Sequence, residues 1–226
     1  MAGLERRLRL VRRLSQAKQR ERLGLFVAEG EDLVDAARAA GIEPVDVLVA
    51  DEDVPAEALA RVSTLAHPPR VVAVFRRADL SRDEVPATAL GLGLWRVGDP
   101  GNVGALIRTA DALGPAFVAL SDGCADPTGP KALRASMGAL FRVALVDFDE
   151  APRPWLALVA HGGEPLAPPE RGTLVLGAER EGLPPELLAR CDARQTIPLV
   201  AGAESLNVAA AGAIALWEAS RRRSSA

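Results

Sequence analysis

The chain has 226 residues, of which 49% are hydrophobic and 25% are charged. These values are ordinary for a globular protein, and the length allows one large domain or two small ones with a buried core. No apolar run approaches the length of a membrane span, and the charges throughout residues 1–14 argue against a secretory signal. Cys124 and Cys191 are far apart and the two histidines are isolated, which predicts neither disulfides nor a metal site. We therefore expect a cytoplasmic protein with no membrane or metal partner.

The charge of the chain is unevenly distributed. Residues 1–22 carry eight basic and two acidic side chains, a local charge of +6, which leaves −9 for the remainder because the net charge is −3. A basic arm on an acidic body is common among RNA-binding proteins, and a solvated helix face is the alternative explanation. The cations of this arm that we predict to contact RNA are Arg6, Arg9, Arg13, Lys18 and Arg20.

The first 77 residues predict a small α/β unit. Leu4, Leu8, Val11 and Leu14 form an apolar stripe at helical spacing, with arginines on the other faces of the helix. Three short apolar segments predict strands, at residues 25–28, 45–49 and 71–75, and the intervening segments predict helices up to residue 40 and over residues 55–65. A unit of this size is marginally stable alone. The polar residues 78–90 predict a linker to a second domain.

Residues 91–226 show a regular alternation of apolar strands and amphipathic helices. The predicted strands are 92–97, 116–120, 144–148, 173–177 and 195–199, and the predicted helices are 103–113, 130–139, 154–160, 184–190 and 206–219. Repeated strand–helix units imply a parallel sheet covered on both faces. Because ligands of such sheets bind outside the carboxyl ends of the strands, the turns after the strands are the places where chemistry is expected.

The first such turn covers residues 99–109. Pro100 and Gly101 form the turn, and Asn102 is a suitable N-cap for the following helix. At about 100° per residue, Arg108 points away from the buried stripe of that helix. Arg108 is therefore either solvated or directed at a ligand.

The second turn covers residues 176–184 and the third covers residues 197–207. In the second, Gly177 and Gly182 bracket a charged triplet, which indicates positive φ angles or a close approach to a ligand, but the spacing is neither a dinucleotide fingerprint nor a P-loop. In the third, Ser205 or Asn207 can cap a helix that continues with small side chains. Each turn alone is a weak signal.

Together and in this order, the three turns resemble motifs 1, 2 and 3 of the SpoU-type RNA 2′-O-ribose methyltransferases, TrmH-like members of the SPOUT superfamily. The matching residues are Asn102-Val103-Gly104, Arg108-Thr109-Ala110, Gly177, Glu179, Gly182-Leu183, Ile197-Pro198 and Ser205-Leu206-Asn207-Val208. Asp126-Pro127, Pro130-Lys131 and Arg134-Ala135-Ser136 are similar to the same family. The chain departs from the pattern at Ala178, where the family often has asparagine.

The resemblance implies a fold and an assembly. The α/β domain over residues 91–226 would contain a deep trefoil knot, an exception to the rule against knots, and residues 1–77 would form an L30e-like RNA substrate-binding domain. The protein would be a homodimer in which two subunits assemble each active site, and the small side chains of residues 209–213 would permit close packing of its helices. Ribosomal RNA is the preferred substrate because L30e-like units often accompany methyltransferases of ribosomal RNA, and tRNA is the alternative.

The resemblance also implies the roles of particular residues. S-adenosylmethionine would lie in a bent pocket formed by Leu176, Gly177, Glu179, Gly182, Ile197, Leu199 and Leu206. The catalytic set would be Asn102, Arg108, Glu179, Ser205 and Asn207, and Lys131 and Arg134 would add to the RNA contacts.

Arg108 has two possible roles in this reaction. The motif-1 arginine of the family is often described as a general base, but a guanidinium rarely loses its proton. A protonated Arg108 would instead clamp the neighbouring phosphate and stabilise negative charge on the ribose 2′-oxygen. Glu179 would orient Arg108 or the ribose, or only cap its own turn, and Ser205 and Asn207 would position the substrate because no histidine is close in sequence to activate either.

Two other functions are compatible with parts of the sequence. A non-catalytic RNA-binding protein would keep the fold without the chemistry, but the joint presence of Arg108, Glu179, Ser205 and Asn207 argues against it. A small-molecule α/β enzyme would not require the basic arm.

Overall fold

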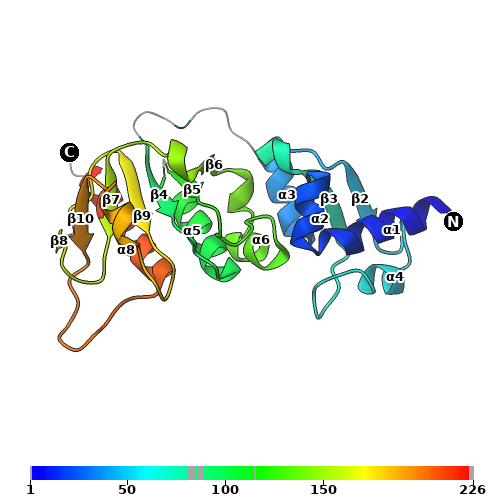
Figure 1. Cartoon of the computed structure of the whole chain (residues 1–226). Helices are drawn as coiled ribbons and strands as arrows, with labels where there is room; N and C mark the ends of the chain where they lie inside the picture. The colour runs from blue at the N-terminus through cyan, green and yellow to red at the C-terminus, as the bar shows by residue number, and fades with distance from the viewer. Residues whose placement is uncertain (1, 81–84, 86–88, 115, 224–226) are drawn as a thin grey trace.

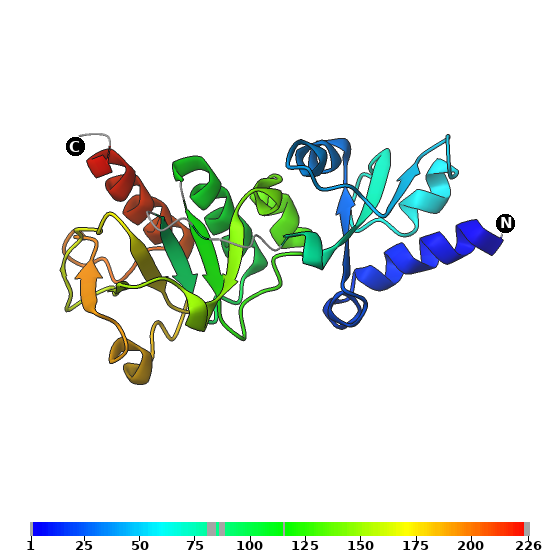
Figure 2. The same cartoon turned by 90° about the horizontal axis from the view of Figure 1, so that it is seen from above.

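The chain folds into two α/β units that lie side by side in an elongated molecule, with the first and the last helix near opposite ends (Figure 1, Figure 2). The structure, a computed structural model, describes residues 2–80, 85, 89–114 and 116–223. Much of the predicted linker over residues 78–90 lies outside the described residues, although Arg77–Leu80 form a short 3₁₀ helix. No described helix is long and apolar enough to cross a bilayer.

The N-terminal unit is a three-stranded antiparallel sheet with helices packed on it. Its helices are α1 (Ala2–Leu14), α2 (Ala17–Leu23), α3 (Glu31–Ala39) and α4 (Ala56–Ala60), and its strands are β1 (Leu25–Glu29), β2 (Asp46–Val49) and β3 (Val71–Arg76), in the order β1-β3-β2. The three strands lie where the sequence predicts them, and the apolar stripe of α1 buries Val11 and Leu14 in the core.

The helix predicted over residues 55–65 is shorter than expected and ends at Ala60. Backbone bonds of the helical type continue to Ser63, but the backbone N–H of Thr64 donates to a side chain instead. The hydroxyls of Ser63 and Thr64 donate to the buried carboxylate of Glu29, and the backbone N–H of Thr64 lies 3.0 Å from Glu29 Oε2. Serine and threonine often compete with helical backbone bonds in this way.

The C-terminal unit is built on a seven-stranded sheet in which every pairing is parallel. Its strands are β4 (Leu90–Leu94), β5 (Phe117–Leu120), β6 (Ala144–Asp147), β7 (Trp155–Leu158), β8 (Glu164–Pro165), β9 (Gly172–Leu176) and β10 (Ala193–Thr196), in the order β6-β5-β4-β9-β7-β10-β8. Its helices are α5 (Pro100–Leu113), α6 (Pro130–Ser136), α7 (Pro185–Leu188) and α8 (Val208–Arg223). The predicted α/β fold with a parallel sheet is confirmed.

The inner strand β4 alternates leucine with glycine, and each residue type lies on one face of the sheet. Its leucines join the core formed with α5 and α8. A Cβ at Gly91 would overlap the ring of Phe117, and one at Gly93 would overlap Thr173. The two glycines therefore leave room for the aromatic cluster on the opposite face, where Phe148 packs edge-on against Trp155.

One predicted helix, over residues 154–160, is wrong, because this segment contains strand β7 between β9 and β10. Periodicity does not distinguish a helix from a strand in so short an apolar run. Tertiary contacts determine the outcome: the backbone N–H of Trp155 donates to Asp192 at 2.7 Å, and its indole N–H donates to the carbonyl of Ala151 at 2.9 Å. The strand predicted over residues 195–199 instead ends at Thr196.

The two units share one hydrophobic core. Phe26 of β1 and Phe75 of β3 are fully buried, and their ring centroids lie 6.1 and 5.4 Å from that of Phe141, which belongs to the C-terminal unit. Ala36 of α3 is packed against Gly138, where a Cβ would overlap the alanine methyl. The N-terminal unit is therefore packed on the chain that follows α6.

Candidate active site

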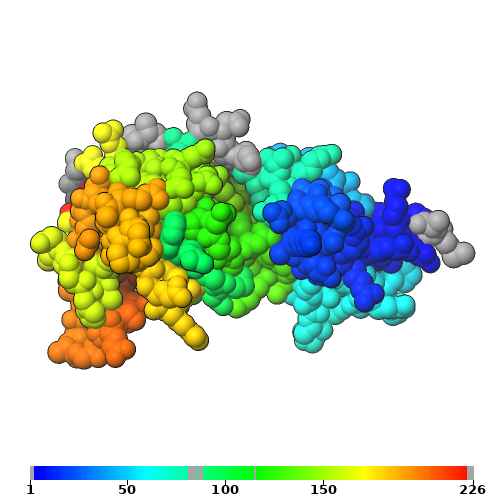
Figure 3. All heavy atoms as spheres, in the orientation of Figure 1, coloured from blue at the N-terminus to red at the C-terminus, as the bar shows by residue number. Residues whose placement is uncertain are grey.

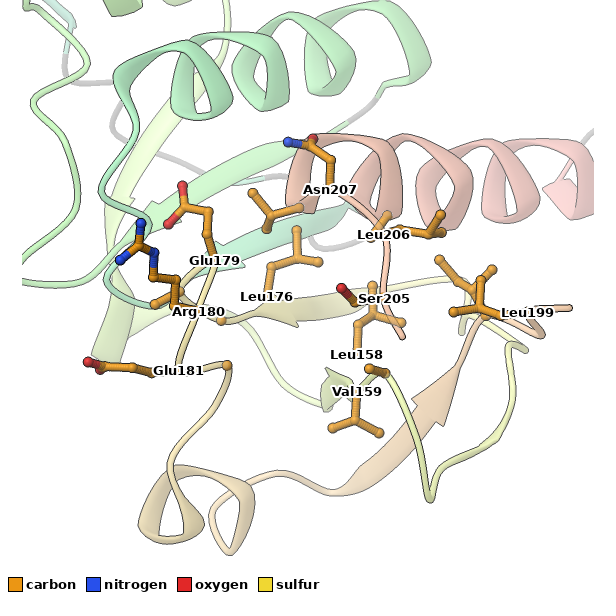
Figure 4. A pocket seen from close by; sticks show the side chains of 17 residues that line it. Leu158, Val159, Leu176, Glu179, Arg180, Glu181, Leu199, Ser205, Leu206 and Asn207 are labelled. Atoms are coloured by element: carbon orange, nitrogen blue, oxygen red, sulfur yellow. The ribbon is translucent and has the colours of Figure 1, made fainter. Parts of the chain in front are cut away.

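A cavity of about 500 Å³ opens at the carboxyl ends of β7 and β9 (Figure 4). Its walls come from residues 158–160, 176–182 and 197–206 and from the beginning of α8. The volume lies within the ~300–1,000 Å³ that small-molecule sites usually occupy. The carboxyl edge of a parallel sheet is also where ligands of such folds bind.

All residues predicted to hold the cofactor line this one cavity: Leu176, Gly177, Glu179, Gly182, Ile197, Leu199 and Leu206. Their contact with a cofactor remains a prediction. The wall formed by Leu158, Val159 and Ala160 was not predicted, because the sequence pattern of that segment indicated a helix. A strand assignment would have placed its carboxyl end at the same edge as β9.

The turn after β9 is closed by backbone groups. Gly182 has a φ of +65°, which favours glycine, and its N–H donates to the carbonyl of Ala178 at 2.9 Å. Gly177 approaches the backbone of Gly182 so closely that a Cβ at residue 177 would overlap it. Because backbone contacts form this turn, it does not require the asparagine side chain that the family often has in place of Ala178.

Three side chains, one from each motif, form a hydrogen-bonded chain beside the cavity. The Asn207 Nδ2 donates to Asn102 Oδ1 at 3.1 Å, and the Asn102 Nδ2 donates to Glu179 Oε1 at 3.0 Å. The orientation of Asn207 is fixed because its Oδ1 caps α8, accepting from the N–H groups of Ala209 and Ala210 at 2.9 and 3.2 Å. We call this chain of Asn207, Asn102 and Glu179 the motif junction.

Glu179 connects the second motif to the first. Its carboxylate also accepts from the backbone N–H groups of Gly98 at 3.3 Å and Asp99 at 3.2 Å. Burial alone would raise the pKa of Glu179, but the hydrogen bonds from Asn102 and from these backbone groups outweigh burial and lower it. Glu179 is thus ionised at neutral pH and is a poor proton acceptor. No hydrogen bond or ion pair joins Glu179 to Arg108 in the described part of the chain.

Helix α5 is capped by Asp99, and not by Asn102 as the sequence predicts. The Asp99 Oδ1 accepts from the N–H groups of Gly101 at 2.7 Å and Asn102 at 3.1 Å. This arrangement leaves the amide side chain of Asn102 free to join the motif junction. The other oxygen of Asp99 pairs with the Lys131 Nζ at 2.8 Å, so a predicted RNA contact, Lys131, is engaged by the first motif although its side chain is exposed.

Arg108 and Ser205, which were predicted to be catalytic, stand apart from the motif junction. Ser205 lines the cavity and is exposed. Arg108 is exposed on α5 and is not among the residues that line the cavity. Six residues of helix place it ~9 Å further along the axis than Asn102. Across the described residues neither side chain makes a hydrogen bond within the chain.

A second, more open cavity of about 590 Å³ lies beside Glu179, on the turn of residues 178–181. Arg96 and Gly123 line it, and Arg96 has a φ of +53°, a backbone conformation that is uncommon outside glycine. Glu179 therefore borders both cavities. No group of three or more His, Cys, Asp or Glu side chains among the described residues is arranged to hold a metal ion.

Four of the five cations predicted to bind RNA in the N-terminal arm are exposed. Arg6, Arg9, Arg13 and Lys18 lie on the surface of α1 and α2, and Figure 3 shows these helices (blue) at the end opposite the loops around residues 180 and 200 (yellow and orange). The prediction for Arg20 is wrong: its side chain is buried and bonded to Asp126, which leaves it unavailable to RNA.

Arg134, a further predicted RNA contact, is half-buried. Its guanidinium donates to the Thr64 Oγ1 at 3.2 Å, across the boundary between the units. Arg134 therefore contacts the N-terminal unit in addition to any contact with RNA.

Comparison with known proteins identifies the family. Residues 89–217 match the sequence profile of the SpoU rRNA methylase family, and residues 5–88 match that of the MRM3-like substrate binding domain. The chain belongs to the SpoU rRNA methylase family. This membership confirms the predicted class, a methyltransferase that uses S-adenosylmethionine to modify RNA at a ribose 2′-oxygen.

The likeness of this SpoU-family chain to its relatives extends over both units. The 23S rRNA (guanosine(2553)-2′-O)-methyltransferase RlmP of Bacillus subtilis is 30% identical, over 91% of this chain and 92% of its own. The SpoU methyltransferase AviRb from Streptomyces viridochromogenes, solved in complex with AdoMet, has a TM-score of 0.86 and 26% identity, covering 97% and 98% of the two chains. An AdoMet-bound rRNA methyltransferase from Sinorhizobium meliloti has a TM-score of 0.83 and 27% identity, covering 95% and 94%.

Proposed function

We propose that this enzyme transfers the methyl group of S-adenosylmethionine to a ribose 2′-oxygen of ribosomal RNA. The motif junction carries the proposal, because it brings polar side chains from three separate turns together beside a cavity of cofactor size. Ribosomal RNA is preferred to tRNA because RlmP and the Sinorhizobium meliloti enzyme, which each match most of both chains, are named for ribosomal RNA.

The residues of the cavity fit this cofactor in chemical character. Leu176, Ile197 and Leu206 offer apolar contacts to an adenine ring, and the turn over residues 177–182 offers backbone N–H and C=O groups. The ionised Glu179 adds a negative charge that favours a sulfonium ion. When bound, S-adenosylmethionine supplies an electrophilic methyl group on a positively charged sulfur.

The protein contributes positioning and electrostatic stabilisation. Correct alignment of two reacting groups lowers a barrier by several kcal/mol, provided that the groups aligning them are themselves held in place. Asn207 meets this condition, because the helix cap and the motif junction leave it one orientation. We place the ribose of the target nucleotide beside Ser205 and Asn207, which line the first cavity and would donate to the ribose oxygens.

We further propose that the enzyme is a homodimer in which α8 forms the interface. Ile214 and Trp217 lie on one exposed stripe of this helix and are 40% and 59% exposed, which is unusual for large apolar side chains. Gly212, part of the small-residue run that suggested an interface, packs instead on Leu106 and Leu176 of its own chain. Arg108 does not line the cavity of its own chain. This position agrees with an active site that is complete only when a second copy of the chain is present.

The trefoil knot is also a proposal. The chain leaves β10 near one edge of the sheet and returns through residues 197–207 to place α8 against β4 and β9 in the middle. A return of this kind is the crossing that a knotted topology requires.

The proposed function is tested by calorimetry with S-adenosylmethionine and by transfer of labelled methyl groups to protein-free ribosomal RNA and to tRNA. We expect binding without added metal and incorporation into ribosomal RNA, at a 2′-O-methyl site that is absent from a deletion strain. Cofactor binding without transfer to any RNA would indicate a catalytically silent RNA-binding homologue. Methyl transfer to tRNA alone would contradict the proposal that ribosomal RNA is the substrate. The absence of a heat of binding with both the cofactor and its demethylated product would contradict the proposed activity.

The dimer is tested by light scattering. The wild-type protein should have the mass of two chains, and Trp217→Glu should have the mass of one, because a buried carboxylate at an apolar interface is strongly unfavourable. A wild-type mass of one chain at micromolar concentration would contradict the proposal.

A further inference from the structure

Asp126 lies on the segment between β5 and α6 and forms ion pairs with two arginines of the N-terminal unit. The Nε of Arg20, a residue of α2, donates to Asp126 Oδ2 at 2.8 Å. The Nη1 of Arg77, the residue that follows β3, donates to Asp126 Oδ1 at 3.1 Å. Arg20 is only 4% exposed, and its Nη1 also donates to the carbonyls of Leu14 and Ser15 at 3.0 and 2.9 Å. One carboxylate of the catalytic unit thus holds two separate elements of the N-terminal unit.

The neighbouring Thr128 completes this cluster. Its backbone N–H donates to Asp126 Oδ1 at 2.9 Å, and its hydroxyl donates to the same oxygen while accepting from Arg77 at 2.9 Å. Burial alone would raise the pKa of Asp126, but the hydrogen bonds from Thr128 and Arg20 and the charge of Arg77 lower it. Asp126 is therefore ionised at neutral pH and fully engaged.

The segment that carries Asp126 leads directly to the active site. Lys131 of α6, four residues after Pro127, forms an ion pair with Asp99. Asp99 caps α5 and accepts a hydrogen bond from the backbone N–H of Asn102. One turn further along α6, Arg134 donates to Thr64 of the N-terminal unit. Helix α6 therefore contacts both the N-terminal unit and the first motif, and any tilt of the N-terminal unit would act on the segment that supports the motif junction.

The charged cluster is better suited to fixing an orientation than to adding stability. Ion pairs taken out of water gain little net free energy, because the cost of desolvation offsets the attraction, and apolar side chains of similar volume often stabilise a fold more. The shared aromatic core of Phe26, Phe75 and Phe141 already holds the two units together. Apolar packing alone does not fix how one unit is rotated relative to the other. The directional hydrogen bonds from two arginines to Asp126 restrict the units to one relative orientation.

We propose that Asp126, with Arg20 and Arg77, is a positioning clamp that sets the distance and angle between the exposed arginines of α1, which are predicted to contact RNA, and the active site, and so selects the nucleotide that is methylated. The inference rests on the proposed function, since it needs an RNA that contacts both units. The substrate is then a folded RNA long enough to reach from the arginines of α1 to the motif junction. A short RNA that occupies only the active site does not benefit from the clamp.

The test compares Asp126→Asn with Asp111→Asn. Asp111 forms a bidentate pair with Arg142, with Arg142 Nη2 2.6 Å from Asp111 Oδ2, so the control removes a similar ion pair whose two members both belong to the C-terminal unit. If Asp126→Asn does not fold, Arg77→Gln replaces it, because Arg77 is 34% exposed in its side chain and its loss leaves Arg20 to pair with Asp126.

Four quantities are measured on the full-length proteins: the radius of gyration from X-ray scattering, the affinity for S-adenosylmethionine, the turnover on protein-free ribosomal RNA from a deletion strain, and the positions methylated. For Asp126→Asn we expect a larger radius of gyration, unchanged cofactor affinity, and turnover reduced by about 10–100-fold, the penalty typical of small misplacements. Methylation should spread to neighbouring nucleotides. Turnover on a short oligoribonucleotide should fall much less.

Two results would overturn the clamp. One is a variant whose scattering, rate and methylated position match those of Asp111→Asn. The other is an equal loss of turnover on long and short RNA, which would mean that Asp126 acts only through the fold. A wild-type protein that methylates no RNA would instead contradict the proposed function, and the scattering comparison would then still show whether Asp126 holds the two units in place.

Discussion

At the scale of single residues, the site is organised by side chains that hydrogen bonds hold in one orientation. The amide of Asn102 is an example, since it accepts from Asn207 and donates to Glu179. The sequence indicated that each of these three residues matters, because each lies in a motif. Their mutual contacts were not predictable, since Asn102 and Asn207 are 105 residues apart in the chain. The same limit explains Arg20, whose exposure could not be judged without knowing that Asp126 lies beside it.

Arg108 offers the sharpest test at this scale. Because its side chain is exposed and makes no hydrogen bond or ion pair within the described chain, Arg108→Ala should change the free energy of unfolding by less than about 0.5 kcal/mol. If Arg108 stabilises charge at the 2′-oxygen, turnover should fall on the order of 100-fold, as it does when an oxyanion donor is removed. Single-turnover kinetics and urea unfolding measure the two quantities.

Arg108→Lys then separates the two chemical roles. Lysine keeps the charge but loses the planar fork of donors, so an electrostatic role predicts partial recovery of turnover with no new pH dependence near neutrality. Lysine also loses its proton more readily than arginine, so a role as general base predicts a new pH dependence. Full activity in Arg108→Ala would exclude Arg108 from the reaction.

Glu179 leads to a prediction about pH. Its pKa is lower in the folded than in the unfolded state, so its ionised form adds stability above the unfolded value, and this contribution is lost as pH falls through the folded value. The difference in unfolding free energy between wild type and Glu179→Gln should thus be constant above about pH 5 and shrink below about pH 4. Urea unfolding from pH 3 to 8 measures it. A difference that grows as pH falls would contradict the ionised junction.

At the scale of elements, close helix packing explains a motif residue that carries no chemistry. Gly104 of the first motif faces α6, and a Cβ there would overlap the carbonyl oxygen of Ala132 and crowd the methyl of Ala135. Its role is therefore to let α5 and α6 approach. The motif was recognised from the sequence, but this reason requires the neighbouring helix. Strand β7 shows a second limit of prediction from the sequence. Its four residues fit the periodicity of a helix or of a strand, and only the neighbouring strands in the sheet determine that it is a strand.

Gly104→Ala should consequently destabilise the protein. Alanine is favoured over glycine in a helix by about 1 kcal/mol, but overlap with a backbone oxygen forces a shift that costs about 1–3 kcal/mol. Thermal unfolding should show a lower midpoint. Gly3→Ala in α1 is the control, since nothing lies within 4 Å of its added methyl, and its midpoint should be unchanged or higher. A more stable Gly104→Ala protein would show that the helices do not need this contact.

At the scale of the whole molecule, the predicted RNA contacts of α1 and the cavity lie on different units. The arginines of α1 that face solvent belong to the N-terminal unit, and the motif junction belongs to the C-terminal one. The apolar pattern and the polar linker predicted the two-unit organisation, and the charge distribution predicted the basic arm. They did not predict that the units share a core, because Phe26 and Phe141 could equally have served separate ones.

RNA affinity should depend on salt through this arm. Each phosphate neutralised contributes about 0.7–0.9 to the slope of log affinity against log salt. Replacing Arg6, Arg9 and Arg13 by glutamine should flatten the slope by about 2–3 and leave cofactor affinity unchanged. Anisotropy titrations at several salt concentrations measure it, with glutamine at the exposed Arg38 and Arg61 as the control. An unchanged slope would mean that the arm is only a solvated face.

The stacked rings of Phe26, Phe75 and Phe141 bear on how such an enzyme can change its target in evolution. A recognition domain on a loose tether can be exchanged by recombination, since nothing on the catalytic side has to match the newcomer. Here the ring of Phe141, in the C-terminal unit, packs in the same core as Phe26 and Phe75 of the N-terminal unit. A domain from another protein would lack side chains that pack against this ring. If the arginines of α1 contact RNA as predicted, new targets are more accessible through gradual substitution on the outer face of α1 than through replacement of the unit that carries it.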